Sequence, residues 1–148
     1  MGIFDTIRSL LGGGKSPEPP KHSFDVESFI YIKMPGNIQP MERGELFEDK
    51  IDPVLARDNL GTVSGGGSLL SDPRPDGTRV VESCGIDIDV TDLDRALEVL
   101  RGLLPQLDAP LGTELHYTRG GAKLQDALTP SGWQLEQSRT DLHPGFGI

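Results

Sequence analysis

The segment Leu60-Gly61-Thr62-Val63-Ser64-Gly65-Gly66-Gly67-Ser68-Leu69-Leu70 places three consecutive glycines among residues that favour β-strands. The turn Ser71-Asp72-Pro73-Arg74-Pro75-Asp76-Gly77 follows, and residues 78–90 then alternate between apolar and polar side chains. Alternation with a period of two is typical of a strand that buries one face. These segments therefore predict a β-hairpin.

The glycines themselves predict a stretch of sheet without side chains, open to a phosphate, a ligand or another backbone. No Gly-x-Gly-x-x-Gly pattern opens a helix here, so the segment does not match the dinucleotide-binding fingerprint. Two interpretations stay open: a glycine backbone that binds an anion, and either a bulge or a strand over which a neighbouring element packs closely. We favour the second.

Hydrophobic spacing predicts further elements on both sides of this hairpin. They are a strand at 26–34, a short helix at 53–59 capped by Asp52, a helix at 92–104 capped by Thr91 and Asp94, and strands at 113–118 and around Trp133 and Leu135. Residues 122–128 are ambiguous. The order predicts an α+β fold: a mostly antiparallel sheet of four to five strands with one main helix on one face. A ferredoxin-like topology is consistent with this order.

The chain divides into a short amino-terminal region and one domain. Residues 1–14 predict an amphipathic helix with a glycine stop, 15–23 a Pro/Gly linker, 24–140 a single α+β domain, and 141–148 a tail. Met1, Gly2 and Thr6 match an acylation pattern, but no polybasic patch supplies the second signal that stable membrane anchoring needs. The sequence therefore disfavours a membrane partner.

Charge and cysteine content narrow the function classes. The 148 residues include 23 acidic and 14 basic side chains, a net charge of -9, which repels nucleic acid and attracts a basic partner. The single cysteine, Cys84, cannot form an internal disulfide, so we expect a reducing, cytoplasmic location.

No pattern in the chain predicts catalysis, a cofactor or a metal. Cys84 and His116 are expected on opposite faces of their strands, which disfavours a nucleophile and base pair. Asp87, Asp89, Asp92 and Asp94 are expected to be solvated or to lie at a helix terminus. We therefore predict a protein that is not an enzyme.

Residues 40–49 predict an irregular loop that combines charge with large apolar side chains, as binding loops often do. The alternative is an ordinary loop whose Phe47 fills the core. The predicted binding residues are Arg43, Glu45 and Phe47 from this loop and Ser64, Gly65, Gly66 and Gly67 from the glycine strand.

Three stretches of the chain together resemble known proteins. They are residues 40–49, the strand Gly61-Thr62-Val63-Ser64-Gly65-Gly66-Gly67-Ser68, and residues 86–113, which end in Ala109-Pro110-Leu111-Gly112-Thr113. In these the chain resembles small, acidic, uncharacterised bacterial proteins, a domain of unknown function. Its size and charge also resemble those of immunity proteins that neutralise bacterial toxins. The resemblance implies no catalytic residue.

The sequence thus predicts a non-enzymatic binding protein that acts through a protein interface, in its sharper form an immunity-like protein that neutralises a basic partner. The alternative is a small-molecule or anion-binding protein or enzyme that uses the backbone of Gly65, Gly66 and Gly67.

Overall fold

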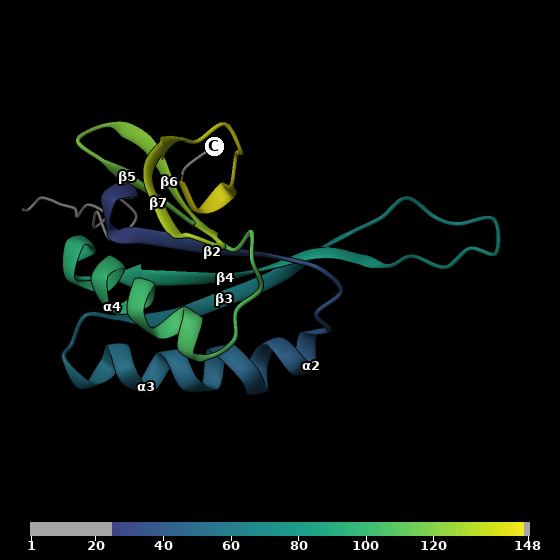
Figure 1. Ribbon diagram of the computed structural model, residues 1–148, viewed down its shortest axis with the longest axis horizontal. Helices are drawn as coiled ribbons and strands as arrows, with labels where there is room; N and C mark the ends of the chain where they lie inside the picture. The colour runs from purple at the N-terminus through teal and green to yellow at the C-terminus, as the bar shows by residue number, and fades with distance from the viewer. Residues whose placement is uncertain (1–24, 147–148) are drawn as a thin grey trace, which may run out of the picture.

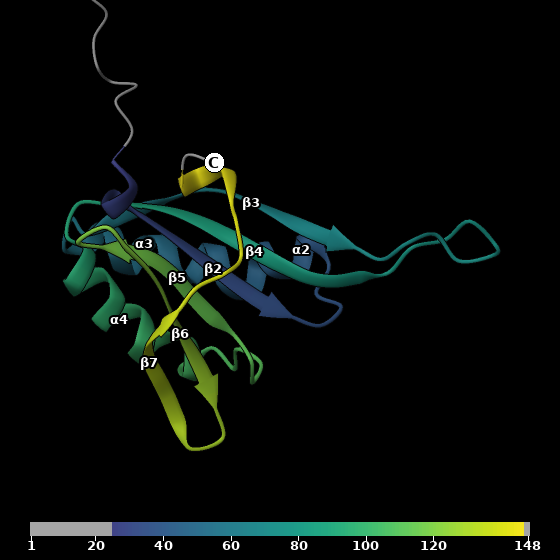
Figure 2. The ribbon, with the colours of Figure 1, turned by 90° about the horizontal axis from the view of Figure 1, so that it is seen from above.

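The computed structural model describes residues 25–146, so the predicted helix at 1–14 and linker at 15–23 lie outside the described residues. The described part is an α+β fold built on one six-stranded antiparallel sheet in the order β3-β4-β2-β5-β6-β7 (Figures 1 and 2). The strands are β2 (Phe29–Pro35), β3 (Gly61–Leu70), β4 (Val81–Val90), β5 (Glu114–Arg119), β6 (Ala122–Thr129) and β7 (Gly132–Ser138). The sheet therefore has more strands than the predicted four to five, because the ambiguous residues 122–128 form β6.

The helical elements are η2 (Val26–Ser28), α2 (Pro40–Arg43), η3 (Gly44–Glu48), α3 (Asp49–Arg57), α4 (Leu93–Gln106) and η4 (Pro144–Phe146). The order β2, α3, β3, β4, α4, β5 and the sheet order β3-β4-β2-β5 form a ferredoxin-like βαββαβ unit, which β6 and β7 extend at the β5 edge. Among the helices of the described residues, none is long and apolar enough to cross a membrane.

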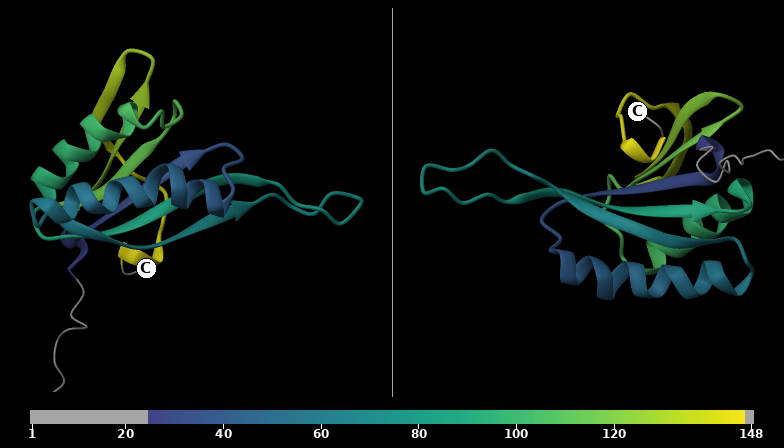
Figure 3. Two further views of the ribbon diagram at one scale, coloured as in Figure 1. Left: turned by 90° about the horizontal axis from the view of Figure 1, so that it is seen from below. Right: turned by 180° about the vertical axis from the view of Figure 1, so that it is seen from behind.

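The core lies between the sheet and the helices α3 and α4, which cover the same face (Figures 1 and 3). Alternate residues of the central strands point into it, and α4 contributes residues at helical spacing. The largest fully buried side chains are Ile30, Ile32 and Met34 of β2, Ile86 and Ile88 of β4, Ile51 and Leu55 of α3, Leu97, Leu100 and Leu104 of α4, and Leu115 and Tyr117 of β5. The predicted strand faces of β4 and β5 are thus confirmed.

The predicted α4 is confirmed, with one correction at its start. Asp92 is the N-cap, because its side chain accepts a hydrogen bond of 3.1 Å from the backbone N–H of Arg95. The predicted cap Thr91 instead donates its hydroxyl to the carbonyl oxygen of Asn59 at 2.6 Å, which ties the β4–α4 connection to the end of α3.

The predicted irregular loop at 40–49 is wrong, since Pro40 to Arg57 is helical throughout α2, η3 and α3. Pro40 stands at the helix start, where its missing N–H costs nothing, and Gln39 and Glu42 form a capping box. Pro53 consequently lies inside α3. The predicted cap Asp52 accepts the backbone N–H of Val63 instead, at 2.9 Å.

The glycine strand forms β3 at the sheet edge, and it contains both features of the favoured interpretation. The pairing with β4 shifts between Val63 and Gly65, so Ser64 is the extra residue of a bulge. A methyl group on Gly66 would lie 2.9 Å from Glu48 Oε2 and 3.1 Å from Arg43 Nε. Gly66 therefore allows an ion pair to approach the strand closely.

A buried carboxylate joins the added strands to α4. Asp126 of β6 is fully buried and accepts hydrogen bonds from the Tyr117 hydroxyl at 2.7 Å, the Glu136 N–H at 2.9 Å and Arg101 Nε at 2.8 Å. Burial, together with this carboxylate, raises the pKa of Tyr117 to about 12, so the phenol stays a donor. Trp133 of β7 adds a bond from its indole N–H to the Arg101 carbonyl at 2.8 Å.

On the opposite face, the ring of Tyr31 lies directly over Gly85 of the neighbouring strand β4, and a Cβ at Gly85 would overlap the ring. Gly85→Ala is therefore expected to lower the free energy of unfolding by about 1–3 kcal/mol, since either the ring or the strand must shift. Urea denaturation measures the change.

Gly102→Ala is the matched control. Gly102 lies in α4 with nothing within 4 Å of its added Cβ. The same methyl group is expected to stabilise the protein there by about 0.5–1 kcal/mol through helix propensity. If Gly85→Ala proved as stable as the wild type, the packing of Tyr31 on Gly85 would not matter to the fold.

Candidate functional site

A C-terminal strap, residues 139–146, crosses the sheet face that the helices leave uncovered (Figures 1 and 2). Its residues pack on β2, where the rings of His143 and Tyr31 lie 4.1 Å apart between centroids and those of Phe146 and Phe29 lie 5.0 Å apart. The guanidinium of Arg139 lies 4.0 Å from the centre of the Phe146 ring. The strap is thus part of the packed structure as far as Phe146, which is 6% exposed.

Two adjoining hollows lie between the strap and β3, with volumes of about 420 and 290 Å³. Both are lined by Tyr31, Leu69 and His143, and together we call them the groove. The larger hollow adds the polar groups Lys33, Ser83, His116 and Asp141; the smaller adds Gly66, Gly67, Ser68 and Asp87. Gly67 pairs with Gly85 across β3 and β4, so neither strand contributes a side chain to the face at this pair.

His143 is held in one orientation within the strap. The backbone N–H of Gly145 donates to its Nδ1 at 2.8 Å. In the neutral ring the proton is then on Nε2, which lies 3.3 Å from Asp87 Oδ1. This pair connects the strap to β4 across the smaller hollow.

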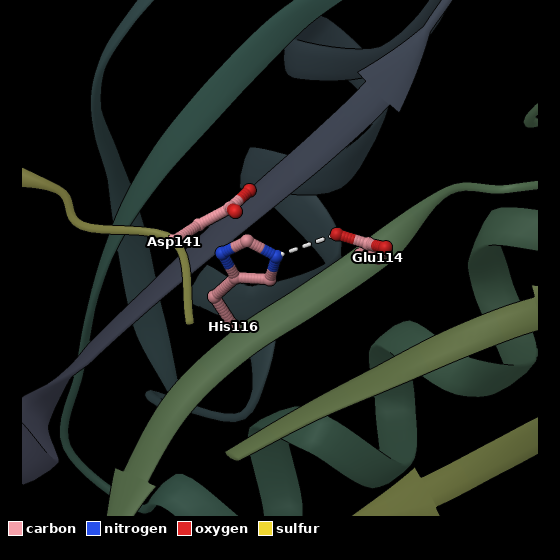
Figure 4. A group of neighbouring side chains, drawn as sticks. All are labelled: Glu114, His116 and Asp141. Carbon is pink, nitrogen blue, oxygen red and sulfur yellow. Dashed lines mark hydrogen bonds and ion pairs between the residues drawn. The ribbon is translucent and has the colours of Figure 1, made fainter. Parts of the chain in front are cut away.

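Three side chains, Glu114, His116 and Asp141, form a cluster at the larger hollow, which His116 and Asp141 line (Figure 4). Glu114 and His116 are two residues apart on β5 and share a face, and Asp141 approaches from the strap. His116 Nε2 lies 2.8 Å from Glu114 Oε1, while Lys33 Nζ donates to Asp141 Oδ2 at 2.6 Å. One ligand atom of each of the three side chains lies within 4.8 Å of the other two, so the cluster offers a nitrogen and two carboxylate oxygens to a cation.

Burial controls the charge of this cluster. His116 is 1% exposed, and the loss of hydration lowers its pKa, although the hydrogen bond and charge of Glu114 act in the opposite direction. The hydrogen bond from Lys33 lowers the pKa of Asp141. At neutral pH the imidazole is therefore uncharged next to an ionised Asp141.

The predicted binding residues from the 40–49 segment lie on the helical side of the molecule. Arg43 forms an ion pair with Glu48, Nε to Oε2 at 2.7 Å, and donates to the Gly67 carbonyl at 3.0 Å. Phe47 is 3% exposed within the core, as the alternative for this segment expected, and Glu45 is exposed on η3.

The predicted residues of the glycine strand divide between the two faces. Gly66 faces Arg43 and Glu48 on the helical side, whereas a Cβ on Gly65 would lie 3.2 Å from Asp87 Oδ2 on the groove side. Ser64 is exposed at the bulge. The structure therefore brings Arg43 next to Gly66 and Gly67, while Phe47 lies in the core and Gly65 borders the groove.

The residues that sequence reasoning missed are those of the strap and the groove floor: Tyr31, Lys33, Asp141 and His143. The local sequence gives one indication of them: the large side chains Leu142, His143 and Phe146 stand in a segment that is otherwise typical of a tail. Cys84 lies in the core, where burial raises its thiol pKa, on the face opposite His116 as predicted.

A comparison of the chain with protein-family models, with curated proteins and with solved structures finds no match. The fold and the groove define an α+β domain of ferredoxin-like topology whose open sheet face is crossed by the strap.

The burial of His116 predicts a pH dependence of stability. Because its pKa is lowered from the ordinary value of 6.5 in the folded state, the unfolded state binds more protons as the pH falls below 6.5. The free energy of unfolding is therefore expected to decrease between about pH 6.5 and the folded-state pKa, with a slope of up to about 1.4 kcal/mol per pH unit.

His116→Gln keeps an amide donor for Glu114 but cannot titrate, so this variant is expected to show a shallower slope over pH 5–7 in urea titrations. Equal slopes in the variant and the wild type would contradict the prediction.

Proposed function

We propose that this chain is a non-enzymatic binding protein whose recognition surface combines the groove with the arm, which we define as residues 69–82. The arm comprises the distal ends of β3 and β4 and the turn between them, and it projects away from the helices and the rest of the sheet (Figures 1 and 3). This projecting arm is the observation that carries the proposal.

The arm is held in shape by its own hydrogen bonds. The backbone N–H of Ser71 donates to the Val80 carbonyl at 2.8 Å, and the Val80 N–H donates to the Ser71 hydroxyl at 3.0 Å. At the tip Asp76 Oδ1 accepts both the N–H of Thr78, at 2.9 Å, and its hydroxyl, at 2.7 Å. A preorganised arm loses less conformational entropy when it binds a partner.

The base of the arm presents apolar side chains next to the groove. Leu69 is 57% exposed and Leu70 is 47% exposed, and Leu69 also lines both hollows. Neighbouring exposed leucines beside a polar groove are typical of an interaction surface, where apolar anchors are surrounded by polar groups.

The ionisable groups of the groove support binding rather than catalysis, since they are paired with one another. His116 is paired with Glu114, Lys33 with Asp141, and His143 lies against Asp87. A catalytic nucleophile or base requires a group directed at substrate.

The net charge of -9 favours a basic partner, because the negative electrostatic field of the protein would accelerate the association of the two. In its sharper form the proposal is an immunity-like protein that neutralises a basic bacterial toxin, which rests on size and charge. We place the protein in the bacterial cytoplasm because its single cysteine, Cys84, is buried and free.

The alternative is a small-molecule or anion-binding protein that uses the backbone of Gly65, Gly66 and Gly67. We favour the protein interface because Asp87 Oδ2 lies next to Gly65, where its negative charge would oppose an anion, and because Glu48 and Arg43 already occupy the space beside Gly66.

A photo-crosslinking residue placed at position 69 or 70 tests the proposal in the native cells. Both positions are expected to yield an adduct with the same protein, identified by mass spectrometry, because both are exposed at the base of the arm. Leu135, which is 50% exposed on β7, is the matched control and is expected to yield no such adduct.

Binding of the captured protein to purified variants completes the test. Leu69→Ser with Leu70→Ser is expected to weaken the affinity at least tenfold, as loss of apolar anchors does, while Leu135→Ser leaves it unchanged. The same adducts from all three positions, or none from 69 and 70, would reject the arm as the recognition surface.

A further inference from the structure

We propose that Glu114, His116 and Asp141 form a binding site for a divalent transition-metal ion such as Zn²⁺. The inference goes beyond the proposed protein interface: the three side chains lie at the larger hollow of the groove, and their test measures metal binding by the isolated protein. It rests on the donor set, on the positions of the three side chains and on the cation that Asp141 already holds.

The donor set suits an ion of intermediate softness. One imidazole nitrogen with two carboxylate oxygens is a combination that zinc and the neighbouring divalent metals bind, whereas calcium and magnesium prefer oxygen ligands alone. His116 presents its Nε2 toward Glu114, and the carboxylate of Asp141 lies beside the same ring (Figure 4). The hollow of about 420 Å³ next to them has room for water molecules to complete the coordination.

Two of the ligands are preorganised. His116 is 1% exposed, and its ring packs edge-on against Tyr31 with centroids 5.7 Å apart. Glu114 is oriented by Gln125, whose Nε2 lies 3.4 Å from Oε2 and leaves Oε1 directed at His116. A hydrogen bond that orients a ligating carboxylate in this way is common at metal sites.

The third ligand must move a short distance. The three ligand atoms lie within 4.8 Å of one another, while two zinc bonds of about 2.1 Å span at most about 4.2 Å. The Asp141 side chain is 45% exposed and belongs to the strap outside any helix or strand, so its carboxylate can turn toward His116.

Lys33 is the resident cation of the site. Its ammonium group donates to Asp141 at 2.6 Å, and its side chain is 34% exposed. A divalent ion therefore has to displace Lys33 from Asp141, and the lysine can turn into solvent when it does. If the cluster binds a metal, Lys33 lowers the metal affinity by competing for Asp141. If the cluster is only an ion-pair network, removing Lys33 creates no metal affinity.

Isothermal titration of the untagged full-length protein with ZnCl₂ tests the site. Glu114→Gln and Asp141→Asn are each expected to weaken Zn²⁺ binding at least tenfold, because each removes a charged ligand. Lys33→Met is expected to tighten it several-fold. Asp94→Asn removes the same charge from an exposed carboxylate that pairs with Arg119, so it is the matched control and should leave Zn²⁺ affinity unchanged.

The ring signals of His116 in NMR spectra are a second readout that does not depend on a variant of this buried residue. Zn²⁺ is expected to shift them, and Mn²⁺ to broaden them, at the stoichiometry found by titration. The proposal is overturned if the wild type binds no Zn²⁺, if Asp94→Asn weakens binding as much as Asp141→Asn, or if Lys33→Met does not tighten it.

Discussion

The contact between the Tyr31 ring and the backbone of Gly85 determines the shape of the open face. Because β4 has no side chain at this position, the Tyr31 ring lies close against the backbone of Gly85, and the ring of His143 packs on it with centroids 4.1 Å apart. That stacking, with the pair of Phe29 and Phe146, fixes the strap across β2. The strap in turn carries Asp141 to His116 and bounds the groove, so the site depends on one aromatic ring over one glycine.

Contacts on the helical side of the sheet cover part of the edge of β3, so we propose the arm and not the whole edge as the recognition surface. An exposed edge strand offers unpaired backbone groups to other chains. Asp52 accepts the N–H of Val63 and Arg43 donates to the carbonyl of Gly67, so side chains of the helical segment bind two backbone groups of this edge. Beyond residue 68 the hairpin leaves the helices, and Leu69 and Leu70 are exposed there.

Elements with a strong period could be predicted from the sequence, and elements defined by long-range contacts could not. The alternation of β4 and the leucine spacing of α4 are local patterns, and both elements form as predicted. Residues 40–49 mix Pro40, Gly44 and charges in a way typical of loops, yet the burial of Phe47 against the core and the capping box at Gln39 stabilise helix there. Strand β6 lacks a clear pattern because its buried polar residue, Asp126, is satisfied by partners on β5, β7 and α4.

The sequence by itself determined the α+β class, the two faces of β4 and β5, the glycine strand with its bulge or close approach, and the acidic charge, because each follows from local spacing, backbone freedom or composition. Only the tertiary structure decided which residues meet. Arg43 and Phe47 turn to the helical side, while Lys33, His116 and Asp141, separated by up to 108 positions, come together under the strap. These long-range contacts depend on strand order and on packing of the strap, and no short-range pattern in the chain encodes them.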